Sequence, residues 1–242
     1  MELIENADFF ESMLARWSPN VELRGYTFVE NQAAPFVQVR RALPMLNLAL
    51  ISSAGAYIDG TESFDLEAKD GDLEFREFPK ELGAEDMRYA AKGYDPKAVQ
   101  LDRNAQIPID RLNEYDANNV IGSLNPVWWS ISPWIPNAVR VADEMAPRLA
   151  ERLHRYEVQA ALLIPASRLC HQTLGVLARG IEASGIPTML LSVDRKLADK
   201  IRAPRTAYYS GEFGSVAGQA GWREYQLRGL DESLRTIEDF DQ

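Results

Sequence analysis

The chain has 242 residues, of which 46% are hydrophobic, and a formal net charge of −10. This length fits one large domain or two small ones, and the apolar fraction is sufficient for a buried core. The acidic balance and the lack of a basic cluster argue against nucleic acid as a partner. No apolar run reaches the roughly eighteen residues of a membrane-spanning helix, so we expect no membrane partner either.

The single cysteine and the first residues bear on location. Cys170 has no second cysteine with which to form a disulfide within the chain, which indicates a reducing, cytoplasmic environment. The first 17 residues carry acidic side chains and no long apolar core, so they do not resemble a secretory signal. Residues 5–18 have the spacing of an amphipathic helix that stops near Pro19.

The first half of the chain predicts a few separate elements. Residues 47–55 form an apolar run that ends in small residues, which is typical of a buried strand at the carboxyl edge of a sheet. Residues 72–79 alternate between polar and apolar side chains and predict an exposed strand. Residues 109–115 follow a proline and predict a short helix.

The second half alternates between helical and strand patterns. Alternation at this spacing is typical of strands joined by helical crossovers. We therefore predict an α/β fold with a parallel or mixed sheet and flanking helices, divided near residue 137 into an N-terminal part, 1–137, and a C-terminal part, 138–242. The predicted helices are 138–155, 168–184, 194–202 and 217–236, and the predicted strands are 158–165, 187–192 and 206–210. The apolar face expected for the first of these helices consists of Val139, Ala142, Met145, Ala146, Leu149 and Leu153.

A candidate site lies where the strand 158–165 turns into the helix 168–184. Ligands of open α/β sheets collect at the carboxyl ends of strands. Ser167 has the position of a helix N-cap, and Cys170 falls in the first turn, where free N–H groups and the helix dipole lower the pKa of a thiol. The alternative is structural, because serine commonly caps helices and a buried cysteine often behaves as a small apolar residue.

The two histidines do not complete a catalytic or metal site in sequence. His171 is adjacent to Cys170 and should point to another side of the helix, so it is a poor general base for the thiol. His154 lies in a polar helical stretch and is expected at the surface. The spacing of these three residues does not match that of metal ligands, and we predict no metal site.

Several stretches, taken together, resemble one family. The chain is similar to the selenocysteine-containing B subunit of glycine, sarcosine, betaine and D-proline reductases over roughly residues 46–226. The stretches that carry the resemblance are LALISSAGAYIDG, GDLEFREFP, GYDPKAVQLDRNAQIPIDRLNEY with IGSL, ALLIPASRLCHQTLGVLARGIEASGIPT, APRTAY and GSVAGQ.

The resemblance implies a catalytic pair. In this family a selenocysteine or cysteine is followed, after two residues, by a second cysteine that resolves the species formed by the first. The corresponding positions here are Ser167 and Cys170. The implied reaction is the reductive cleavage of a C–N or C–S bond in a small amino acid or its derivative, with electrons from thiols. No cofactor is expected on this chain, although the resemblance allows a pyruvoyl group in a partner subunit.

The serine leaves three explanations open. Ser167 is a replacement for selenocysteine, or the protein works through Cys170 alone, or it has lost the reductase chemistry and only binds. A serine hydroxyl needs a strong adjacent base before it can attack, and none is visible in the sequence. The alternative function is therefore a non-catalytic protein that binds a small molecule or another subunit, for which the aromatic residues Trp128, Trp129 and Trp134 offer a packed loop or an interface.

Three further residues in the matching stretches are candidates for substrate binding. The Arg76 guanidinium can hold a carboxylate with two hydrogen bonds, and Asp102 and Asn104 can hold an amine. Each also has a structural alternative, because Arg76 can pair with a nearby acid and the other two can cap a turn. By resemblance, the expected partners are a second reductase subunit or a thiol electron donor, in a homo- or hetero-oligomer.

Overall fold

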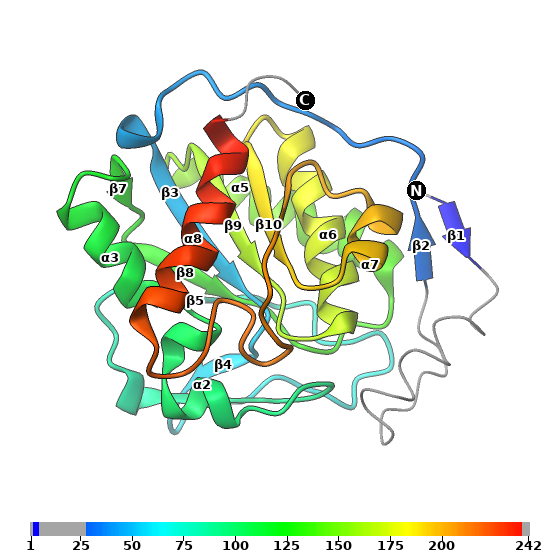
Figure 1. The fold of residues 1–242 in the computed structure, drawn as a ribbon. Coiled ribbons are helices and arrows are strands. Elements are labelled where there is room, and N and C mark those ends of the chain that lie inside the picture. The colour runs from blue at the N-terminus through cyan, green and yellow to red at the C-terminus, as the bar shows by residue number, and fades with distance from the viewer. Residues whose placement is uncertain (1, 5–27, 239–242) are drawn as a thin grey trace.

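A seven-stranded sheet forms the centre of the computed structural model, which describes residues 2–4 and 28–238 (Figure 1). Every pairing in it is parallel except that of β5 with β8, so the predicted α/β fold with a mainly parallel sheet is confirmed. The strand order is β11 (Thr206–Tyr208), β10 (Thr188–Ser192), β9 (Ala160–Ile164), β3 (Asn47–Ser52), β8 (Val127–Ser130) and β5 (Arg76–Pro79), and β7 (Ser123–Leu124) also pairs with β3.

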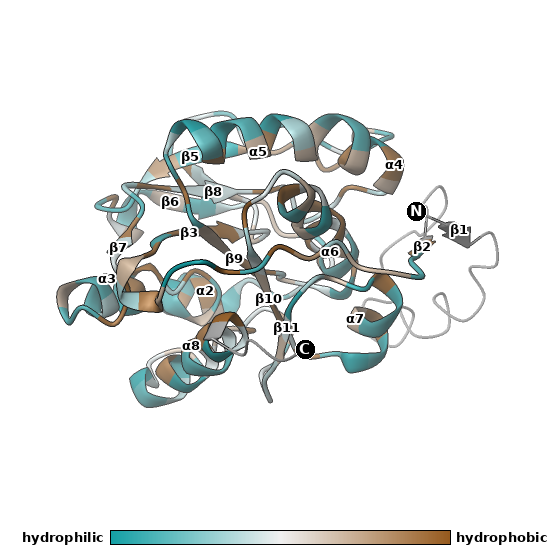
Figure 2. Ribbon diagram, turned by 90° about the horizontal axis from the view of Figure 1, so that it is seen from above, coloured by the Kyte–Doolittle hydropathy of each residue, from teal (hydrophilic) through white to brown (hydrophobic). Residues whose placement is uncertain are grey.

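Helices cover both faces of this sheet (Figure 2). One face carries α4 (Ala138–Arg140), α5 (Ala146–Arg155) and α6 (Arg168–Ala183), and the other carries α2 (Lys97–Leu101), α3 (Ile109–Ala117) and α8 (Arg223–Glu238). The short α7 (Arg195–Ile201) packs against α6. Two antiparallel pairs lie outside the sheet, β1 (Glu2–Ile4) with β2 (Phe28–Glu30) and β4 (Ala56–Ile58) with β6 (Met87–Tyr89).

The central strands are apolar throughout because both of their sides are buried. In β3, Leu48 and Leu50 face the α3 and α8 side, whereas Ala49 and Ile51 face the α5 and α6 side. Side chains of a strand alternate between its two faces, so a sheet covered by helices on both sides requires apolar residues at consecutive positions. This is the pattern that predicted the strand.

The predicted helix 138–155 contains a feature that periodicity does not show. Val141–Met145 form a π-helical turn in which the N–H of Ala146 bonds to the carbonyl of Val141. Such a turn inserts one extra residue and rotates the preceding segment. Ala138 and Val141 are therefore buried instead of the predicted Val139 and Ala142, while the predicted face from Met145 to Leu153 is confirmed.

Two other predicted elements differ from the structure in their bounds, and two predictions are not tested by it. The strand predicted at 72–79 is confirmed only over Arg76–Pro79, and the last helix begins at Arg223, six residues after the predicted start. The helix predicted at 5–18 lies outside the described residues. The sheet takes strands from both sides of residue 137, and the division into two parts at that residue stays a prediction. Within the described residues, no helix is long and apolar enough to cross a bilayer.

Candidate functional site

The strand order places a topological switch point at the carboxyl edge of the sheet, between β3 and β9. After β3 the chain continues to β7 and β8 on one side, and it then returns to place β9 on the other side of β3. Connections from adjacent strands diverge at such a switch point, and ligands of open α/β folds bind there. Ser53 follows β3 and Ser167 follows β9, so both lie at this point.

Serine residues lie at the carboxyl ends of four parallel strands. Ser52, Ser130 and Ser192 are the last residues of β3, β8 and β10, and Ser167 follows β9 at the start of α6. All four are at most 1% exposed. The sequence analysis singled out only Ser167, although the apolar runs of β3, β8 and β10 each stop at a serine. The polar hydroxyls line the sheet edge at which the candidate site lies.

Ser167 caps α6 as predicted. Its backbone is extended, with φ −142°, and its Oγ accepts a hydrogen bond from the Cys170 N–H at 3.2 Å. The same Oγ lies 3.1 Å from the Cys170 Sγ, and Sγ lies 3.3 Å from the Pro133 carbonyl oxygen. The Ser53 carbonyl oxygen is 3.8 Å from Sγ on another side. The Ser167 hydroxyl thus donates to the sulfur, and the Pro133 and Ser53 carbonyl oxygens can accept the thiol proton.

The state of the Cys170 thiol differs from the prediction. Cys170 is 1% exposed, and this burial raises the pKa of its thiol, although the hydrogen bonds from Ser167 act in the opposite direction. Removal from water penalises the charged thiolate more than the helix N-terminus stabilises it. The expected lowered pKa is therefore wrong for this closed arrangement, in which the thiol is protonated at neutral pH.

Two glycine-containing segments cover the pair. Gly93, with φ +81°, lies so close to Ser167 that a β-carbon at this position would be 3.5 Å from the Ser167 Oγ. The neighbouring Tyr94 hydroxyl donates to the Ala54 carbonyl at 2.6 Å, and the Gly214 N–H donates to the Ala166 carbonyl at 2.9 Å. Both segments lie against the turn that bears Ser167, and we expect a molecule that reaches Cys170 to displace one of them.

His171 is fully buried and holds the turn rather than the reacting groups. Its Nδ1 lies 3.1 Å from the Ser167 carbonyl oxygen, and its Nε2 lies 2.9 Å from the Ser192 Oγ. The ring also packs edge-on against Phe213. The prediction that His171 points away from the Cys170 thiol is confirmed. The sequence did not indicate that His171 connects the ends of β9 and β10.

Burial lowers the pKa of His171 from 6.5 to about 4, which makes the stability of the fold depend on pH. Below pH 6.5 the imidazole of His171 is protonated in the unfolded chain, whereas in the folded chain it stays neutral down to about pH 4. Acidification therefore favours unfolding. We expect the free energy of unfolding to fall by about 2 kcal/mol between about pH 7 and pH 5. Urea denaturation across this range measures it. His171→Gln should flatten the dependence and the exposed-residue control His154→Gln should not. A wild-type profile that is flat over this range would contradict it.

The three predicted substrate-binding residues lie apart from the Ser167–Cys170 pair. Arg76 begins β5, three strands from β9 and thus about 14 Å away at the usual strand spacing. Its guanidinium stacks on Phe64 at 3.8 Å, donates to the Glu62 carbonyl and lies 3.9 Å from Asp72. The structural alternative foreseen for Arg76, a nearby acidic partner, is present.

Asp102 and Asn104 belong to a capping network. The Asp102 carboxylate accepts from the Asn104 N–H, the Gly221 N–H and the Gln226 side chain. Asn104 is 4% exposed, and its side chain bonds to Asp102 and Asp110. Both residues therefore serve the turn between α2 and α3 in this structure, and substrate binding by them stays a prediction.

The aromatic stretch is part of the core. Trp128 and Trp129 are 2% and 0% exposed, and Trp134 is 6% exposed. Trp128 stacks on Phe78, and Trp129 meets Tyr156 edge to face. The predicted packing of this stretch is confirmed, but residues 127–130 form the strand β8 and not a loop. The interface is wrong, because the three rings offer almost no surface to a partner.

Known proteins match the chain along most of its length. Residues 69–166 match the family described as "Glycine/sarcosine/betaine reductase selenoprotein B (GRDB)". This region includes Arg76, Asp102 and Asn104 and ends one residue before Ser167. The "D-proline reductase subunit gamma" of Acetoanaerobium sticklandii is 27% identical over 199 residues, which cover 82% of this chain and 81% of that protein.

A second relative is longer than this chain. The "Glycine reductase complex component B subunit gamma" of Symbiobacterium thermophilum is 32% identical over 111 residues, which cover 45% of this chain and 25% of that protein. No solved structure matches the chain. The matches agree with the motifs from which the resemblance was inferred, and they confirm that the chain resembles the glycine/sarcosine/betaine reductase selenoprotein B family.

Proposed function

We propose that the chain is a subunit of a thiol-dependent reductase that cleaves a C–N or C–S bond in a small amino acid or its derivative. The observation that supports this most directly is the 3.1 Å contact between the Ser167 Oγ and the Cys170 Sγ at the switch point of the sheet. The names of the relatives support the substrate class, since they are subunits of D-proline and glycine reductases.

The chemistry requires a thiol or a selenol at position 167. A thiolate or selenolate there attacks the substrate, and over the whole cycle a C–N bond is replaced by a C–H bond and an N–H bond. The two electrons and two protons come from a dithiol, which leaves as a disulfide. Cys170 is near enough to form the intermediate S–S or Se–S bond with residue 167, and a serine hydroxyl cannot take part in this bond.

A partner subunit completes the proposal. By resemblance, a pyruvoyl group on a partner activates a substrate amine, and this chain would then supply the chalcogen pair alone. The relatives are named as subunits of reductases, which supports assembly with other chains.

The replacement Ser167→Cys tests the proposal. We expect this variant to form an internal disulfide with Cys170 under mild oxidation, seen as the loss of both titratable thiols without dimer formation. With a partner subunit present, it should also consume D-proline, glycine or betaine with dithiothreitol as reductant. Ser167→Ala is the matched control, because it keeps one thiol and should do neither. A Ser167→Cys variant that retains two free thiols after oxidation would contradict the proposed geometry.

One set of observations favours a second function, the binding of a ligand or subunit without redox chemistry. Ser167 is 1% exposed, and the base nearest in sequence, His171, contacts its carbonyl oxygen rather than its hydroxyl. Among the described residues, no base is recorded in contact with the Ser167 hydroxyl that could activate it as a nucleophile. Under this second function, Cys170→Ala binds the partner subunit as the unmodified protein does, and Ser167→Cys oxidises internally but turns over no substrate.

A further inference from the structure

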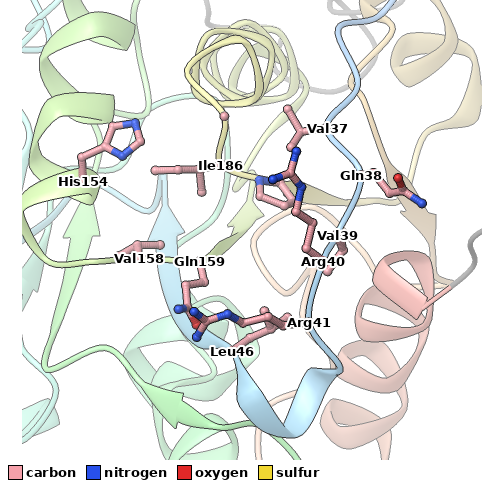
Figure 3. A pocket seen from close by; sticks show the side chains of 12 residues that line it. Val37, Gln38, Val39, Arg40, Arg41, Leu46, His154, Val158, Gln159 and Ile186 are labelled. Atoms are coloured by element: carbon pink, nitrogen blue, oxygen red, sulfur yellow. The ribbon is translucent and has the colours of Figure 1, made fainter.

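We propose that the amino edge of the sheet carries a second binding site, for a small organic carboxylate with a short apolar body. The site is a pocket of about 520 Å³ beside the segment 37–41 (Figure 3). Its walls include Leu46, Gln159 and Pro187, which are the residues immediately before the strands β3, β9 and β10. It is separated from Ser167 and Cys170 by at least the length of β9, about 16 Å.

The charge of the pocket is opposite to that of the chain. Arg40, Arg41 and His154 are the ionisable residues that line it, and no acidic side chain among the described residues does so. The whole chain has 36 acidic and 26 basic residues. Figure 3 shows both guanidinium groups turned to the inside of the pocket, with that of Arg41 near Gln159.

These two arginines also differ from most others in the chain. Among the described residues, neither Arg40 nor Arg41 has a carboxylate partner, whereas arginines such as Arg103, Arg140 and Arg223 pair with one or two acids. A bound anion would supply the counter-charge that both guanidinium groups lack. Guanidinium groups hold carboxylates through two parallel hydrogen bonds.

The wall that bears the arginines is fixed in place. The Val37 N–H donates to the Glu182 carboxylate at 2.7 Å, and the Val37 carbonyl accepts from Arg205 at 2.5 Å. Phe36 lies under the Arg205 guanidinium at 4.1 Å, and Val39 is buried. The backbone before the arginines is therefore held by a buried ion pair, so the pocket exists before a ligand arrives.

The apolar walls of the pocket favour an organic carboxylate over an inorganic anion. Val39, Leu46, Val158 and Ile186 are aliphatic residues that line the pocket. A phosphate ion keeps its water on all sides and gains nothing from such walls, whereas an amphipathic acid satisfies both the arginines and the aliphatic side chains. A volume of this size is typical of small-molecule sites, which measure roughly 300–1,000 Å³.

Isothermal titration calorimetry with three probes tests the site in the full chain. We expect hexanoate to bind with one-to-one saturation and more tightly than hexanol, which lacks the charge, or inorganic phosphate, which lacks the apolar body. Arg40→Gln and Arg41→Gln should each weaken hexanoate binding about tenfold, because each removes a charge-assisted hydrogen bond. Both residues are exposed, so the variants should fold, which the unchanged melting temperature would verify.

Arg228→Gln is the matched control, since it removes the same charge from an exposed position on α8. It should leave hexanoate binding unchanged. The proposal is overturned if hexanoate does not saturate, if hexanol or phosphate binds as tightly as hexanoate, or if Arg228→Gln weakens binding as much as the two pocket variants do. None of these outcomes depends on reductase activity, so the test is independent of the proposed function.

Discussion

Glu182→Gln is expected to lower the free energy of unfolding by about 3–5 kcal/mol, because it breaks a buried ion pair on one side only. The Glu182 side chain is fully buried, and its Oε1 lies 2.6 Å from Arg205 Nη1 and 2.7 Å from the Val37 nitrogen. Its Oε2 accepts two hydrogen bonds from Thr188, at 2.7 and 2.8 Å. Both oxygens therefore face donors.

A glutamine amide cannot satisfy this arrangement. Turned one way, its NH₂ group faces the Arg205 guanidinium and the Val37 N–H and leaves both without an acceptor. Turned the other way, it faces the Thr188 N–H, which loses its acceptor, while the Thr188 hydroxyl can accept from the amide. The Arg205 guanidinium, 7% exposed as a residue, would also lose its counter-charge. Guanidinium chloride denaturation gives the loss directly, from the change in midpoint at constant slope.

A double variant separates the ion pair from simple packing. Glu182→Gln combined with Arg205→Met removes both charges, so it should recover part of the stability that Glu182→Gln alone has lost. Glu151→Gln is the surface control, because Glu151 pairs with Arg155 in an exposed helix pair and should cost less than about 1 kcal/mol. A loss below about 1 kcal/mol for Glu182→Gln would show that the buried pair is not needed to hold the segment 37–41.

Local patterns predicted the elements of the second half because each buries a regular face. The strand β9 and the helix α6 have continuous or periodic apolar residues, and Ser167 is a capping residue at the junction. The π turn at Val141–Met145 has no such signal, since its one-residue insertion shifts the face without changing composition. Periodicity alone therefore assigned Val139 and Ala142 to the core in place of their neighbours.

The sequence predicts where the candidate site lies, but it does not predict that the Cys170 thiol is buried and protonated. The strand, turn and cap locate Ser167 and Cys170, whereas the burial of the thiol depends on segments distant in sequence, such as Pro133 and Gly93. The contacts of Arg205 with Glu182 and Val37 were not predictable either, because the order and register of the strands bring these distant residues together. Contacts of this kind are fixed by topology, and a single sequence does not reveal them.

Cys170 is expected to react with a thiol reagent at least about a thousand times more slowly in the native protein than in the denatured chain. The reaction requires a thiolate and access, and burial opposes both, since the residue is 1% exposed and the pKa of its thiol is raised. The chain has one cysteine, so the absorbance released from 5,5′-dithiobis(2-nitrobenzoate) reports this residue alone.

The cover over the thiol sets how fast native labelling proceeds. Tyr94→Phe removes the hydrogen bond to the Ala54 carbonyl, whose loss of about 1 kcal/mol should speed labelling roughly fivefold. Tyr57→Phe on β4 is the matched control, because it removes the same hydroxyl from a half-buried tyrosine and should leave the rate unchanged. Equal acceleration by both variants would rule out the segment at Gly93 and Tyr94 as the cover. If Tyr94→Phe alone accelerates labelling, opening of this segment is a step that any chemistry at Cys170 must include, and a substrate or partner subunit that drives the opening would control when the thiol is available.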